Sequence, residues 1–268
     1  MSLDAKEAKL RVTALGIMLV TAFITVVAVG LVSSPLEAGS TEIRWVDVLF
    51  DRSNDSYPIT IQNLMWLLFA ICLAELYTRW QRATNEQQQL HRDLLSDDES
   101  KLYRSKDLVA IFTAINSDQD SANFYLQRLV KNVITQFQIN NDSSHASNML
   151  SNSLDLLYNE LDIKYNMVRY LVWVIPTLGF IGTVMGIAYA LSEAGNLPSL
   201  DDDVALKAWV ALITTKLGLA FNTTLLSLLQ STLLVYLLHV SQGREEGTLN
   251  KVGQYCFERL VNRLIEET

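Results

Sequence analysis

Long apolar blocks, nearly free of charge, constrain this chain more than any other feature of its sequence. They run over Val12 to Ser33, Ile61 to Tyr77, Trp173 to Ala190 and Val204 to Val240. A helix of about 20 apolar residues crosses the roughly 30 Å hydrocarbon layer of a bilayer. Because 50% of the 268 residues are hydrophobic and only 19% are charged, and polar stretches also occur, the apolar residues are concentrated in these blocks. The sequence predicts an all-α integral membrane protein with four transmembrane helices.

The first block has a rival interpretation, a cleaved signal peptide. It is longer than a signal-peptide core of about 7–15 residues, and no Ala-x-Ala-like site follows it. A first transmembrane helix is therefore favoured.

Breaks between the blocks divide the chain into nine predicted segments. Pro35, Gly39 and Pro58 mark a polar loop, and Pro198 lies in a short acidic loop. The segments are an N-terminus (1–11), transmembrane helix 1 (12–33), a loop (34–60), transmembrane helix 2 (61–78), a helical stalk (79–165), transmembrane helix 3 (166–191), a second loop (192–206), a surface turn plus transmembrane helix 4 (207–240) and an amphipathic helix (241–268).

The orientation of the four helices follows from the distribution of Lys and Arg. If Arg169 is counted at the stalk end of the third span and Lys207 with the second loop, seventeen of these residues lie before the first span, between the second and third spans, or after the fourth, and only three lie on the side of the two loops. Basic residues favour the cytoplasmic side of a membrane. We therefore predict that both termini and the stalk are cytoplasmic and that both loops are periplasmic.

Several classes of function are disfavoured. The net charge of −8 gives no basic surface for nucleic acid, and no glycine-rich phosphate loop or nucleophile motif occurs. Cys72 and Cys256 have neither metal-ligand nor disulfide spacing, so we expect both to be packing residues and expect no metal site. An enzyme is not expected.

Two stripes of small and hydroxyl-bearing residues stand out in the last two spans. The third span carries Gly179, Gly182, Thr183, Gly186 and Ala190, and the fourth carries Ala211, Thr215, Gly218 and Asn222. At helical spacing each set shares one face, which allows close helix approach or lines a polar path. Thr183 and Thr215 are predicted at matching depths, so that their hydroxyls can face each other. The alternative is that each threonine bonds back to its own helix.

Neither of these spans has a carboxylate. No Asp or Glu occurs from Ile163 to Ser192 or from Val204 to Ser241. A hydroxyl does not titrate near neutral pH. If the two helices line an ion path, another chain must supply the titrating group.

Three further residues are candidates within or beside the spans. Pro176 lacks a backbone N–H and is a predicted hinge. Lys216 is expected to extend to the outer surface, or else to influence which ions gain access. Glu75 is expected at the membrane interface, with an intramembrane role as the alternative.

The sequences VIPTLGFIGTVMGI (Val174 to Ile187) and ALITTKLGLAFNTTLLSLL (Ala211 to Leu229) resemble the two signature helices of the MotA/TolQ/ExbB proton-channel family. The four-span plan is similar to the MotA-like branch. The chain departs from the pattern at Lys216, where a small residue is usual, and at Asn222-Thr223-Thr224, which is more polar than the corresponding TolQ-like stretch.

The resemblance implies a stator-like homopentamer in lipid of the bacterial inner membrane, surrounding a dimer of a single-span MotB/TolR/ExbD-like subunit. The partner's aspartate would bind H⁺ or Na⁺ opposite Thr183 and Thr215, and ion flow would turn the pentamer. The resemblance implies no cofactor besides the transported ion. The predicted ion pathway comprises Thr183, Thr215, Asn222, Gly182, Gly186 and Gly218.

Two other functions compete with this one. A membrane scaffold or signalling protein would use the glycine stripe only for packing and the stalk to recruit a cytoplasmic partner. A secondary transporter is disfavoured, because the four spans show no internal repeat.

Overall fold

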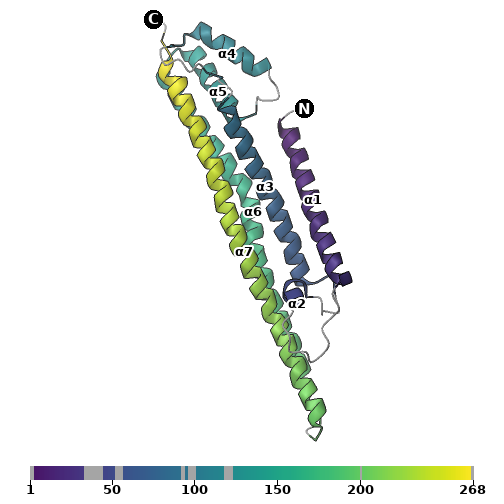
Figure 1. Cartoon of the computed structure of the whole chain (residues 1–268). Helices are drawn as coiled ribbons and strands as arrows, with labels where there is room; N and C mark the ends of the chain where they lie inside the picture. Colours follow the sequence, from purple (N-terminus) through teal and green to yellow (C-terminus); the bar gives the residue numbers. More distant parts are fainter. Residues whose placement is uncertain are drawn as a thin grey trace. The chain divides into compact units, whose positions relative to one another are not determined.

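The structure is a computed structural model and describes residues 3–32, 45–51, 57–91, 94–95, 101–117, 123–199 and 201–266. Regular structure in these ranges is helical, apart from one isolated parallel bridge between Tyr103 and Leu264. The elements are α1 (Leu3–Val32), α2 (Trp45–Phe50), α3 (Ile61–Gln89), α4 (Ser105–Ser117), α5 (Tyr125–Asn140), α6 (Ser143–Ala194), α7 (Asp203–Arg259) and the short 3-10 helix η1 (Val261–Arg263) (Figure 1).

Four of these helices, α1, α3, α6 and α7, are long and apolar enough to cross a membrane. This confirms the predicted all-helical fold with four candidate spans. Helices α6 and α7 contain 52 and 57 residues, or about 78 and 86 Å at 1.5 Å per residue, so each extends well beyond a bilayer. Helix α7 is continuous from Asp203, and residues 207–214 are part of it.

The nine segment boundaries remain predictions. Of the predicted loop at 34–60, positions 34–44 and 52–56 lie outside the described residues, and the described remainder includes α2.

The chain divides into two compact units. The first, called here the stalk unit, comprises Met1–Thr13, Leu76–Met167 and His239–Thr268. Its core is built around α5, whose apolar residues recur at helical spacing, with contributions from α4 and from the stalk portions of α6 and α7. Fully buried members of that core include Leu108, Leu126, Leu129, Val133, Ile134, Phe137, Leu249 and Val252. Burial of these apolar side chains stabilises helices in the otherwise polar segment between the second and third spans.

The second unit, called here the membrane unit, comprises Ala14–Glu75 and Val168–Leu238. Short contacts attach α2 to α3: the Trp66 indole Nε1 donates to the Leu49 carbonyl at 2.8 Å, and the Phe50 and Trp66 rings stack at 5.8 Å. The backbone N–H of Asn63 donates to the Thr60 hydroxyl at 3.2 Å, as at a helix N-terminus. These contacts hold α2 and Thr60 beside the first turns of α3.

Both cysteines are buried and unbridged, as expected for packing residues. Cys72 lies in α3 within the membrane unit, and Cys256 lies in α7 within the stalk unit.

Candidate functional site

The glycine stripe of α6 lies directly against α7. A Cβ built on Gly179 would lie 2.0 Å from the Ser227 Oγ, and one on Gly186 would lie 2.4 Å from the Ala220 Cβ. A Cβ on Gly182 would lie 2.7 Å from the Thr223 Oγ1. Since carbon atoms in contact are normally 3.5–4.0 Å apart, these three positions admit a side chain only if the neighbouring atoms of α7 shift. The bare face predicted from sequence is a packing seam within the chain.

Three threonine hydroxyls gather at this seam and are called here the hydroxyl cluster: Thr183 on α6, and Thr223 and Thr224 on α7. The Thr183 hydroxyl donates to the Ala220 carbonyl at 2.9 Å and lies within 2.5 Å of the Thr224 Oγ1 and 3.4 Å of the Thr223 Oγ1. Thr223 and Thr224 each donate to the Gly179 carbonyl, at 3.1 and 3.2 Å. The hydroxyl cluster can bind or relay a proton only through neutral oxygen atoms.

The predicted pairing of Thr183 with Thr215 is absent within the chain. Thr215 is exposed, and its hydroxyl donates to the Ala211 carbonyl of its own helix at 2.8 Å. The reason is the face that α7 buries against α6. That face carries Ala220, Thr223 and Ser227, whose spacing makes them a second small-residue stripe.

The predicted α7 stripe therefore stays uncovered in the described chain. A Cβ on Gly218 would have no atom within 4 Å, Thr215 is exposed, and Asn222 is half-buried. Sequence reasoning missed Thr223 and Thr224 as partners of Thr183. The recurrence of small residues from Ala220 to Ser227 could have identified them.

Pro176 lies inside a continuous α6. It cannot bond to the carbonyl of Val172, one turn earlier. The Ser231 hydroxyl of α7 donates to that carbonyl at 3.4 Å. The proline therefore exposes an acceptor that the neighbouring helix uses, and this is the structural setting of the predicted hinge.

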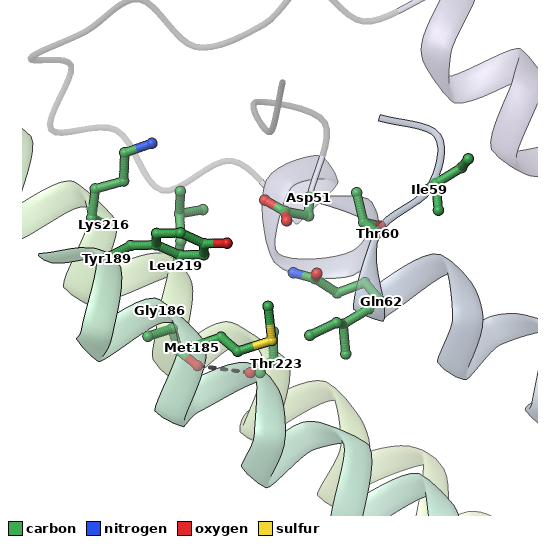
Figure 2. Close-up of a pocket in the computed structure, with 13 residues that line it drawn as sticks. Asp51, Ile59, Thr60, Gln62, Met185, Gly186, Tyr189, Lys216, Leu219 and Thr223 are labelled. Atoms are coloured by element: carbon green, nitrogen blue, oxygen red, sulfur yellow. Dashed lines mark hydrogen bonds between the residues drawn. The ribbon is translucent and has the colours of Figure 1, made fainter. Parts of the chain in front are cut away.

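A pocket of about 430 Å³ adjoins the seam within the membrane unit. Asp51 and residues 59–62, including Thr60 and Gln62, supply one wall, while α6 and α7 supply the other (Figure 2). Lys216 is half-buried and lines this pocket, as do Gly182 and Gly186. Glu75, near the other end of the second predicted span, is buried and is absent from the pocket lining.

A second polar group, missed by sequence reasoning, lies in the stalk unit. Glu86 and Glu245 are both fully buried, and the hydroxyls of Tyr125 and Tyr165 each donate to Glu245 at 3.0 Å. The Tyr125 backbone N–H donates to Glu86 at 2.9 Å, and the Arg82 Nε lies 3.8 Å from its other oxygen. Glu86 lies outside the predicted span at 61–78. Burial raises its pKa to about 7, although the Tyr125 N–H and the Arg82 guanidinium both act to lower it.

In the described part of the chain, no group of three or more His, Cys, Asp or Glu side chains is placed to hold a metal ion.

Comparison with known proteins gives one family match. Residues 117–245 match the MotA/TolQ/ExbB proton channel family, a range that includes both small-residue stripes, the hydroxyl cluster and Pro176. No curated protein and no solved structure matches the chain.

Proposed function

Because residues 117–245 form a domain of the MotA/TolQ/ExbB proton channel family, we propose that this chain is the channel subunit of an ion-driven motor whose titrating carboxylate lies on another protein. The family consists of non-enzymatic membrane channel proteins, and it implies complexes with partner subunits. In the proposed complex a homopentamer of this chain surrounds a dimer of a single-span MotB/TolR/ExbD-like subunit. Flow of H⁺ or Na⁺ past the partner's aspartate rotates the pentamer around the dimer.

The observation that carries this proposal is the uncovered stripe of α7. Ala211, Thr215, Gly218 and Asn222 share one face of α7, and Thr215 and Gly218 are exposed on it. In a bilayer, a face of small and hydroxyl-bearing residues favours a closely packed helix over lipid tails. A partner helix carrying a carboxylate would fit this stripe and would supply the titrating group that residues 163–192 and 204–241 lack.

The proposed orientation puts both termini and the stalk unit in the cytoplasm of a bacterial inner membrane. It rests on the 17 basic residues on one side of the four spans against three on the other.

Two threonine substitutions test the assignment. Thr215 and Thr232 are both exposed on α7, and each donates to its own helix at 2.8 Å, so they form a matched pair. In proteoliposomes containing this chain and its partner, Thr215→Val and Thr183→Val should abolish partner-dependent ion flux and leave assembly intact. Thr232→Val should retain the flux.

Assembly is tested separately by native mass spectrometry of the co-purified complex, which should contain five copies of this chain and two of the partner. A complex that forms but carries no ion flux would instead support the membrane scaffold or signalling function. Unchanged flux in both Thr183→Val and Thr215→Val would refute the assigned pathway.

A further inference from the structure

The pocket beside the seam contains a polar side chain whose hydrogen-bonding capacity is unused. Gln62 is only 1% exposed, and neither Oε1 nor Nε2 has a hydrogen-bond partner among the described residues. Figure 2 shows its amide directed into the space between α3 and the α6–α7 pair. Leaving a buried polar atom unsatisfied is unfavourable, so the amide favours a hydrogen-bonding partner on its pocket side.

Water is the partner that the dimensions of the pocket favour. A pocket of about 430 Å³ has room for on the order of ten waters at their liquid volume. Thr60, Gln62 and Thr223 supply donors and acceptors around it. A polar and roomy site of this kind holds water, whereas an apolar cavity stays dry.

Opposite charges line the same pocket. Asp51 contributes a largely buried carboxylate and Lys216 a half-buried ammonium group. Figure 2 shows them on opposite walls. A carboxylate attracts a cation and an ammonium repels it, so the pair lets a hydrated cation enter without holding it tightly. Conduction requires this balance, because an ion must both enter and leave.

The pocket and the hydroxyl cluster share one residue, Thr223. Thr223 lines the pocket, and its hydroxyl lies 3.4 Å from that of Thr183. Gly182 and Gly186 form the adjoining wall without side chains that would obstruct the approach.

We propose that this pocket is a water-filled vestibule through which hydrated monovalent cations reach the hydroxyl cluster from the side of the membrane where α2 lies. This inference rests on the proposed function, since it describes the access route of the same ion. In this proposal Gln62 hydrogen-bonds the water that surrounds the passing ion, and Lys216 limits how long a cation stays in the pocket.

Thiol accessibility tests the vestibule without relying on ion flux. The complex with its partner is reconstituted in proteoliposomes, and Gln62→Cys is treated with a membrane-impermeant cationic methanethiosulfonate. The wild-type cysteines are both buried and provide the blank. Met65→Cys, on a fully buried position of α3, and Leu64→Cys, on a position 45% exposed, are the controls. Because only a hydrated thiol ionises and reacts, Gln62→Cys should react at least about tenfold faster than either control.

Met185→Cys probes the opposite wall of the pocket and should also react, which keeps the test valid if Gln62→Cys does not fold. Modification at either position should reduce ion flux several-fold, and Gln62→Leu should do the same without any reagent. Absence of reaction at both positions would overturn the vestibule. The vestibule would also be overturned if modification of the introduced cysteine left the ion flux unchanged, or if Gln62→Leu left it unchanged. If the wild-type complex carries no flux, the proposed function fails, while the accessibility result still reports whether the pocket is open to water.

Discussion

Replacing Gly186 by alanine tests a close contact between α6 and α7 in the membrane unit. The new methyl carbon would lie 2.4 Å from the Ala220 Cβ and 2.9 Å from the Ala220 Cα. Restoring a normal carbon–carbon separation requires α6 and α7 to move apart by roughly 1 Å at this point. Overpacking of this kind costs about 1–3 kcal/mol. Alanine also favours the helical state over glycine by up to about 1 kcal/mol, so the net loss of stability is smaller.

Gly16→Ala is the matched control, because Gly16 is helical, exposed, and has no atom within 4 Å of a built Cβ. Its substitution gives the change in helix propensity without a clash. Gly186→Ala should therefore be less stable than Gly16→Ala by about 1–3 kcal/mol. The free energy of unfolding is measured for both variants in mixed micelles of increasing SDS fraction, followed by far-UV circular dichroism.

The double variant Gly186→Ala/Ala220→Gly removes the methyl group that the new side chain meets. It should recover much of the lost stability, because only the 2.9 Å approach to the backbone Cα remains. If Gly186→Ala is as stable as Gly16→Ala, or if the double variant recovers nothing, α6 and α7 do not pack through this contact.

Further predictions concern the stalk unit. The pKa of Glu86 is raised from 4.5 to about 7, so the folded state binds more protons than the unfolded state, and stability should fall as the pH rises through that interval, by on the order of 3 kcal/mol. Glu86→Gln should remove that dependence in unfolding measured from pH 5 to 8. Tyr165→Phe removes a donor to the buried Glu245 and should lower the free energy of unfolding by about 1–3 kcal/mol, whereas Tyr170→Phe, 57% exposed, should change it little.

Two outcomes would contradict these predictions. Stability that rises between pH 5 and 7 in the wild type and not in Glu86→Gln would mean that Glu86 is ionised in the folded state. Equal stability of Tyr165→Phe and Tyr170→Phe would mean that Glu245 does not depend on the Tyr165 hydroxyl.

The helical fold was predictable because membrane spans can be recognised in the sequence by their length and apolar composition. Hydrocarbon offers no hydrogen bonds to the backbone, so a single apolar segment must be helical whatever its neighbours. The helical stalk predicted between the second and third spans was equally accessible, since Leu126, Leu129, Val130, Val133 and Phe137 of α5 recur at helical spacing and are fully buried. These predictions needed only local information.

Partners between distant segments were not predictable in the same way. The sequence singles out Thr183, but the neighbours of Thr183 depend on which face α7 turns towards α6, and α7 has two candidate stripes. The Glu86 and Glu245 pair lies 159 positions apart in sequence, and nothing local marks either residue as buried. In the sequence, Gln62 is simply the second residue of an apolar span. Only the structure shows that its amide is buried beside a pocket.

The two stripes of α7 separate folding from function. Ala220, Thr223 and Ser227 are covered by α6, so enlarging the residues opposite them should lower the stability of the membrane unit. Thr215 and Gly218 touch little in the described chain, so changes there should leave the free energy of unfolding nearly unaltered. If the uncovered stripe receives a partner helix, a bulky side chain at Gly218 should block assembly or ion flux in a chain that is still folded. A stripe that served only to fold the chain could not produce this combination, because its substitution would lower stability and activity together.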